Sequence, residues 1–178
     1  MENRRIPQVT FKAREGDEDA IGGCNFIGGT WKDLTSDDYF KGKKVVLFSL
    51  PGAFTPICSS QQLPGYQEKY DEIKNLGIDE VYCISVNDAF VMNCWFRDQA
   101  IKNIKPIADG NGHFTNGMGM LVNKEHLGFA HRSWRYSAVI NDGVIEKMFV
   151  EPGKNDKGED MDPFTVSDAD TIIAYLKG

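Results

Sequence analysis

Two nearly continuous apolar runs, residues 44–50 and 80–86, are the clearest feature of the hydrophobic pattern along this chain. Runs of this kind are typical of strands that are covered on both faces of a sheet. Helical spacing of apolar residues follows each run, over 59–76 and over 89–101, and a shorter strand is predicted over 104–108. Since strands and helices alternate, the pattern favours a parallel sheet with right-handed crossovers.

Capping residues and helix breakers predict where helices begin, bend and end. A short helix is predicted over 31–40, with Thr35 or Ser36 as its cap. The helix that follows the first strand is expected to kink at Pro64–Gly65 and to end at Gly77.

The pattern changes toward the C-terminus. Residues 136–140 and 144–150 flank Asp142–Gly143, which is the signal of a tight β-hairpin, and residues 167–170 predict a capping box for a final helix. Parallel strands followed by an antiparallel hairpin and a helix describe an α/β, thioredoxin-like fold with a central mixed sheet flanked by helices. The length fits one domain over residues 1–178.

Composition and charge mainly exclude partners. Hydrophobic residues make up 41% and charged residues 26% of the 178 positions, which is typical of a globular protein. The formal net charge is -6 and the basic residues form no stripe, so neither nucleic acid nor an anionic membrane is expected as a partner. No apolar run is long enough to cross a bilayer and the first residues show no signal core, so a cytoplasmic location is expected.

Cysteine and histidine are the residue types that narrow the chemistry: Cys24, Cys58, Cys83, Cys94, His113, His126 and His131. They include no CxxC pair and no spacing that suits zinc, so neither a disulfide scaffold nor a metal site is expected. In a reducing compartment such cysteines are either small buried side chains or redox-active groups. Cys24 and Cys94 have no motif around them and are assigned no role.

The segment from Pro51 to Cys58, PGAFTPIC, places one cysteine where it becomes reactive. It follows a predicted strand and precedes a predicted helix, so Cys58 falls in the first turn of that helix. There the unpaired N–H groups and the positive end of the helix dipole favour a thiolate over a thiol. Because the thiolate is the nucleophilic form, the sequence indicates sulfur chemistry at Cys58 rather than the more frequent role of a buried structural thiol.

The same segment resembles a known family. Pro51, Thr55 and Cys58 match the PxxxTxxC signature of peroxiredoxins. Four further stretches resemble the type-5, plant type II-like subgroup and the peroxiredoxin half of bacterial peroxiredoxin–glutaredoxin hybrids: Leu63–Gly65, Ser85–Asp88, Trp134–Ser137 and Asp162–Asp170.

The resemblance implies an antioxidant enzyme, a thiol-dependent peroxidase that reduces hydrogen peroxide and alkyl hydroperoxides through a cysteine sulfenic acid. It implies that Cys58 is the peroxidatic cysteine, that Thr55 turns its hydroxyl toward the sulfur and the peroxide, and that Pro51 shields the pocket. Arg135 is then the residue that holds the thiolate and polarises the departing oxygen; Arg132 is its rival, and the Trp-Arg-Tyr-Ser context favours Arg135. No prosthetic cofactor and a homodimer are further implications.

How oxidised Cys58 is reduced stays open at this point. Cys83 follows Cys58 by 25 residues, the spacing at which plant type II relatives place a resolving cysteine. Its place in mid-strand favours a small buried side chain instead, and a Cys58–Cys83 disulfide would require the first turn of the Cys58 helix to unwind. The alternative is an external thiol: glutathione, glutaredoxin or thioredoxin. Gln62 stands where family members often have histidine, and it can offer hydrogen bonds but no charge.

Two other functions follow from a reactive cysteine alone. A redox sensor would pass a disulfide from oxidised Cys58 to a partner without sustained turnover, and a cysteine hydrolase would need a histidine beside the sulfur. Phe54, Phe90 and residues 117–121 are expected to form an apolar rim that accepts alkyl hydroperoxides, although burial in the core is the simpler interpretation of the two methionines in 117–121.

Overall fold

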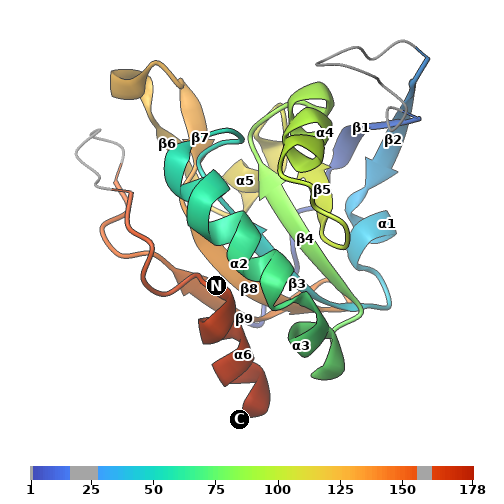
Figure 1. Cartoon of the computed structure of the whole chain (residues 1–178), viewed down its shortest axis with the longest axis vertical. Helices are drawn as coiled ribbons and strands as arrows, with labels where there is room; N and C mark the ends of the chain where they lie inside the picture. The colour runs from blue at the N-terminus through green and yellow to red at the C-terminus, as the bar shows by residue number, and fades with distance from the viewer. Residues whose placement is uncertain (1, 17–27, 156–161) are drawn as a thin grey trace.

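A five-stranded mixed sheet forms the centre of the molecule, with the strand order β5-β4-β3-β8-β9 (Figure 1). The computed structural model describes residues 2–16, 28–155 and 162–178. The strands of the sheet are β3 (Lys44–Ser49), β4 (Glu80–Ser85), β5 (Lys105–Ala108), β8 (Tyr136–Asn141) and β9 (Val144–Val150). β3, β4 and β5 run parallel, whereas β8 and β9 join them antiparallel. The predicted mixed sheet, and the predicted strands within it, are confirmed.

Helices cover both faces of this sheet (Figure 1). They are α1 (Ser36–Phe40), the π-helix η1 (Cys58–Gln62), α2 (Leu63–Glu68), α3 (Tyr70–Asn75), α4 (Ala89–Asp98), α5 (His113–Gly117), the 3-10 helix η2 (Glu125–Leu127) and α6 (Ala169–Lys177). Alternate residues of each strand point to opposite faces, so Phe48 and Cys83 belong to one core cluster, with α2, α3, α4 and α6. Leu47 and Tyr82 belong to the other, with α1 and α5.

Two short antiparallel ribbons lie outside the central sheet and were not predicted. One pairs β1 (Thr10–Glu15) with β2 (Thr30–Thr35), and the other pairs β6 (Leu121–Asn123) with β7 (His131–Ser133). The predicted helix over 31–40 is therefore wrong in its first half, because residues 31–35 form the second strand of a ribbon. Thr35 is confirmed as the cap of α1: its side chain accepts from the Asp38 N–H, and the Asp38 side chain accepts from the Thr35 N–H.

The helix after β3 is irregular next to the predicted kink at Pro64–Gly65 and again at Lys69. Leu63 donates its N–H to the Cys58 carbonyl, five residues back, which makes η1 a π-helix just before Pro64. A proline ring clashes with the carbonyl four residues earlier in a regular α-helix, and the wider π turn accommodates it. A second break falls at Lys69, between α2 and α3, and Gly77 follows with a φ of 88°.

The predicted C-terminal hairpin is confirmed, whereas the predicted N-cap of the final helix is wrong. Asp142 and Gly143 both have positive φ, 47° and 74°, as a two-residue turn between β8 and β9 requires. The final helix is capped by Asp168, whose side chain accepts from the Thr171 N–H at 2.7 Å. Ser167 does not cap it, because its hydroxyl donates to Glu151 at 2.8 Å.

Candidate active site

The loop after β3 delivers Cys58 to a buried position in the first turn of a helix. Helical structure begins at Pro56, and the Ser59 N–H donates to the Thr55 carbonyl at 3.0 Å. Proline suits such a start because its missing N–H would have no partner there. Cys58 is fully buried. The predicted placement of this cysteine, just past a strand end and within the first helical turn, is confirmed.

A residue on the neighbouring loop holds the cysteine loop in place. Asn87 follows β4, and its Oδ1 accepts from the Ala53 N–H at 3.0 Å and from the Ser85 hydroxyl at 2.7 Å. Phe54, the next residue, has a φ of 62°, which is unfavourable for an aromatic side chain, and it is 52% exposed. Asn87 was not predicted as a site residue. The sequence signal for it is a polar residue two positions after the carboxyl end of the strand adjacent to β3.

Thr55 turns its hydroxyl proton away from the sulfur. Thr55 Oγ1 donates to the Gly52 carbonyl at 2.7 Å. Gly52 lies close to its neighbours: an added Cβ would be 3.1 Å from Arg132 Nη1 and 3.2 Å from Thr55 Cγ2, so both side chains would have to shift slightly. Pro51, which begins this loop, is buried.

Arg135 directly precedes β8, the strand next to β3, and its side chain contacts Cys58. Its guanidinium is 1% exposed, and Nη1 donates to Cys58 Sγ at 3.4 Å and to Gln62 Oε1. Nη2 donates to both carboxylate oxygens of Asp162, each at 2.8 Å. Burial alone lowers the pKa of Arg135, but the charges of Cys58 and Asp162 outweigh it, so the pKa of Arg135 is raised.

The rival arginine lies nearby but has other contacts. Arg132 Nε donates to the Phe129 carbonyl at 3.1 Å, and its guanidinium lies beside Gly52. Burial lowers the pKa of Arg132. Among the described contacts it is therefore Arg135, not Arg132, that pairs with the Cys58 sulfur.

Two further polar residues complete the surroundings of Arg135. Gln62 is fully buried, and besides accepting from Arg135 it donates Nε2 to the Ser49 carbonyl at 3.5 Å. It makes the hydrogen bonds that the sequence predicted. Asp162 was named only within a matching stretch and received no role, because nothing in the sequence connects it to an arginine 27 residues earlier.

Cys83 is buried on β4, where its partner across the sheet is Phe48 on β3. Burial raises the pKa of the Cys83 thiol well above its usual value, and the nearby Cys58 charge raises it further. Cys94 is half-buried on α4, and Cys24 lies outside the described residues.

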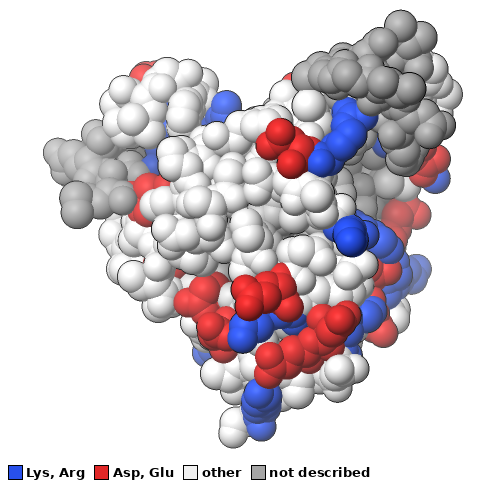
Figure 2. Space-filling view, in the orientation of Figure 1, with Lys and Arg blue, Asp and Glu red and all other residues white. Residues whose placement is uncertain are grey.

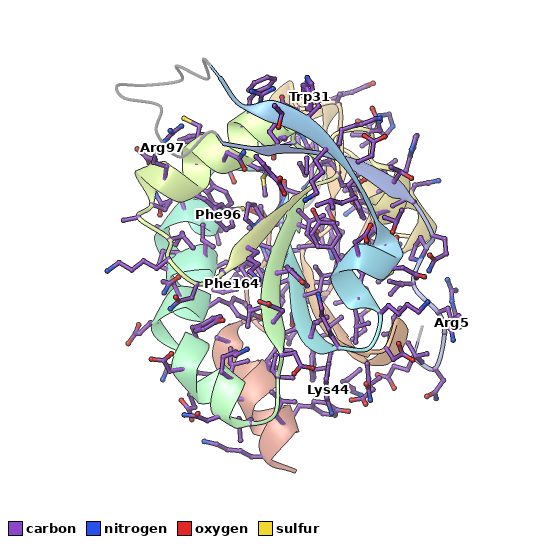
Figure 3. The ribbon with its side chains drawn as sticks, turned by 90° about the vertical axis from the view of Figure 1, so that its right-hand side faces the viewer. Arg5, Trp31, Lys44, Phe96, Arg97 and Phe164 are labelled. Carbon is purple, nitrogen blue, oxygen red and sulfur yellow. The ribbon has the colours of Figure 1, made fainter. Side chains whose placement is uncertain are left out.

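The two methionines considered for the apolar rim lie in the core, as the simpler interpretation predicted. Met118 and Met120 are buried in the core cluster on the face of the sheet opposite to Cys58. Phe90 on α4 contacts Trp31 edge-on, with 5.3 Å between ring centroids. Trp31 lies on the β1–β2 ribbon (Figure 3). Within residues 2–16, 28–155 and 162–178, no three His, Cys, Asp or Glu side chains gather to hold a metal ion. None of the helices in the described part of the chain is both long and apolar enough to cross a membrane.

Comparisons with known proteins agree with this geometry. A family model described as redoxin matches residues 3–173. A peroxiredoxin from Synechocystis sp. is 53% identical over 178 residues, covering 100% of this chain and 92% of the relative. A hybrid peroxiredoxin from Haemophilus influenzae is 52% identical over 176 residues, covering 99% of this chain and 66% of the relative. The crystal structure of a Plasmodium falciparum antioxidant protein, a 1-Cys peroxiredoxin, matches with a TM-score of 0.89 at 37% identity and covers 99% of both chains.

The fold and the site together define a class, the thioredoxin-like proteins that use a cysteine thiol. Here the cysteine lies at a helix start, and a buried guanidinium donates a hydrogen bond to its sulfur. The chain belongs to the peroxiredoxins, enzymes of the redoxin family that reduce peroxides with the help of a thiol reductant and without a prosthetic cofactor. The predicted thioredoxin-like fold and the predicted antioxidant peroxidase are confirmed at this level.

Proposed function

We propose that this peroxiredoxin reduces hydrogen peroxide and alkyl hydroperoxides through a sulfenic acid at Cys58. The observation that carries the proposal is the buried 3.4 Å contact from Arg135 Nη1 to Cys58 Sγ. A fixed cation on the sulfur favours the thiolate, which is the form that attacks a peroxide. The sulfur forms a bond to the terminal peroxide oxygen, the O–O bond breaks, and the departing oxygen leaves with the electron pair as alkoxide or hydroxide, which takes up a proton.

The surrounding residues suit this displacement. Arg135 offers N–H donors where negative charge develops on the departing oxygen, and such preorganised donors are a large source of rate enhancement. The Thr55 hydroxyl donates its hydrogen bond to the Gly52 carbonyl. Its oxygen is therefore left to accept a hydrogen bond from the peroxide O–H. Pro51 shields the pocket, and Gln62 fixes the orientation of the guanidinium.

The sulfenic acid is reduced by an external thiol, glutathione together with glutaredoxin, rather than by Cys83. Two observations support this route: Cys83 is buried on a central strand, and its raised pKa keeps it a thiol, whereas a thiolate is the attacking species. The Haemophilus relative is named a hybrid peroxiredoxin and the Plasmodium relative a 1-Cys peroxiredoxin, which fit a reductant outside this domain. Thioredoxin is the alternative reductant, and a homodimer is the proposed assembly.

Intact-mass spectrometry after one equivalent of peroxide tests both steps. We expect the wild-type protein to gain one oxygen, and to gain the mass of one glutathione when glutathione is present. Cys58→Ser is expected to show neither change and no peroxidase activity, whereas Cys83→Ser behaves like the wild type. A loss of two hydrogens that disappears in Cys83→Ser would show an internal disulfide and would contradict the external route.

Turnover separates the enzyme from a redox sensor. With glutathione and glutaredoxin in excess, the enzyme consumes many equivalents of peroxide per chain. A single stoichiometric oxidation under the same conditions would contradict the peroxidase.

A further inference from the structure

The guanidinium of Arg135 is shared between two anions. Nη1 donates to Cys58 and Nη2 to both oxygens of Asp162, and the Phe164 ring lies 5.6 Å from the guanidinium carbon. The ion pair is asymmetric in exposure: the Arg135 side chain is 1% exposed and the Asp162 side chain is 36% exposed. A buried cation that loses its partner is strongly unfavourable.

The elements that surround Cys58 and Arg135 contain few other charged side chains. Residues 45–67, which include the cysteine loop, η1 and most of α2, contain no Asp, Glu, Lys or Arg. Figure 2 shows the consequence, a face over α2 that is nearly free of charged side chains, while charges gather over α3 and α6. The titratable groups that interact with the Cys58–Arg135 pair are Asp162 and Cys83 on β4. One step further away, Tyr66 on α2 interacts with Cys83, and Arg132 lies beside Gly52.

We propose that Asp162 is a positioning residue that serves as the permanent counter-ion of Arg135, while the Cys58 thiolate is its transient one. The inference rests on the proposed function, in which Cys58 cycles between thiolate and sulfenic acid. When the thiolate is protonated or oxidised, its charge disappears from beside a buried guanidinium. Asp162 then still balances Arg135, so the arginine keeps its place for the next turnover. The carboxylate also competes with the sulfur for the same cation.

The same contact anchors the chain between the site and α6. Asp162 has a φ of 48°, in the region that few residues other than glycine adopt. Residues 165–167 are held separately, since their backbone N–H groups donate to the Glu151 carboxylate at 2.9 Å. Asp162 and Phe164 therefore depend on Arg135 for their attachment, whereas residues 165–167 do not.

Asp162→Asn tests the counter-ion, because asparagine keeps the shape and one acceptor oxygen but removes the charge. The readout is the pH dependence of Cys58 alkylation by iodoacetamide in the full chain, followed on the Cys58 peptide by mass spectrometry. We expect the alkylation midpoint to move to lower pH by about 0.5–1 unit, since one competing anion is gone. The matched control is Asp170→Asn, which removes an equal charge from an exposed pair with Lys69 and leaves the midpoint unchanged.

An unchanged or higher midpoint in Asp162→Asn, or the same shift in Asp170→Asn, would overturn the proposal. Limited proteolysis gives a second, independent readout with Asp162→Ala: faster cleavage within 162–164, and wild-type resistance over 165–167, whose amides are bonded to Glu151. Unchanged cleavage within 162–164 would overturn the anchoring role. Neither measurement needs peroxide turnover, so the two proposals fail separately: a shifted midpoint in a protein without peroxidase activity would sink the proposed function and leave only the charge pairing of Asp162 with Arg135.

Discussion

At the scale of single residues, burial and partners distinguish two arginines that lie three positions apart. Arg135 is 1% exposed and contacts the Cys58 sulfur, a buried glutamine and a carboxylate. Arg132 is half-buried and donates to a backbone carbonyl. A cation can stabilise charge on a departing oxygen only from a fixed and desolvated position, so the two are expected to contribute very differently to catalysis.

Replacing each arginine in turn measures that difference. Arg135→Ala is expected to slow the oxidation of Cys58 by hydrogen peroxide about 100- to 1000-fold, the usual cost of losing a preorganised donor to a developing oxyanion. Arg132→Ala, the matched control, is expected to slow it by less than about tenfold. Stopped-flow measurement of the first oxidation step gives both rates. Equal losses in the two variants would show that the contact with sulfur is not the source of the rate.

At the scale of elements, one carboxylate fastens the C-terminal segment to the sheet. Glu151 follows β9, is 1% exposed, and accepts five hydrogen bonds of 2.8–2.9 Å from Thr165, Val166 and Ser167. Burial works to raise the pKa of Glu151, but these hydrogen bonds outweigh it, so the pKa is lowered. The start of α6 is thereby held beside the segment that reaches Arg135.

Glu151→Gln is expected to destabilise the protein by about 2 kcal/mol at pH 7, because a buried charge-assisted network is lost. Since the folded pKa is lowered, the stabilisation is present above the unfolded value of about 4.3 and is lost as pH falls through the folded value. The gap between variant and wild type therefore closes in acid, as urea unfolding from pH 7 downward would show. Glu72→Gln, which removes an exposed partner of Lys177, should leave the free energy of unfolding nearly unchanged, because exposed ion pairs are screened by water. A difference in the free energy of unfolding between Glu151→Gln and wild type that stays constant with pH would contradict an ionised Glu151.

At the scale of the whole molecule, the sheet is buried on both faces, and the core against these faces contains tyrosine and cysteine side chains that stay protonated. Tyr66 packs against Phe48 with ring centroids 4.0 Å apart and donates its hydroxyl to the Ser167 carbonyl at 2.8 Å. Burial raises the pKa of Tyr66, of Tyr136 and of Cys83. The unfolded chain releases these protons at lower pH than the folded chain, so stability is expected to fall as pH rises above about 9.

Tyr66→Phe separates the two contributions of this hydroxyl. We expect the variant to be about 1 kcal/mol less stable at pH 7, where it lacks one hydrogen bond, and to lose less stability in alkali, so that the two proteins converge. Urea unfolding at several pH values between 7 and 11 measures both effects. Tyr175→Phe, at a partly exposed position on α6, serves as the control with the wild-type slope. Parallel curves for Tyr66→Phe and wild type would refute the burial argument.

The hydrophobic pattern predicted the central strands because each is a local run of apolar residues, and it predicted the β8–β9 hairpin because Asp142–Gly143 suits only a tight turn. It missed the two ribbons, since β1 and β2 are short, largely exposed strands whose apolar content is weak. The kink was placed at Pro64–Gly65 because proline is the visible local signal, whereas the π-helix before it depends on a hydrogen bond that sequence does not display.

For the site, the sequence by itself determined where Cys58 lies. Strand, turn and helix signals within a few residues are sufficient to place it at a helix start, and this placement is why Cys58 is the proposed nucleophile. The resemblance favoured Arg135 over Arg132, but only the tertiary structure decided the contacts around the sulfur: that Arg135 donates to it, that Asp162 shares the guanidinium, and that burial raises the pKa of the Cys83 thiol. These depend on strands brought together across the sheet, and contacts between residues far apart in the chain leave no local pattern to predict them.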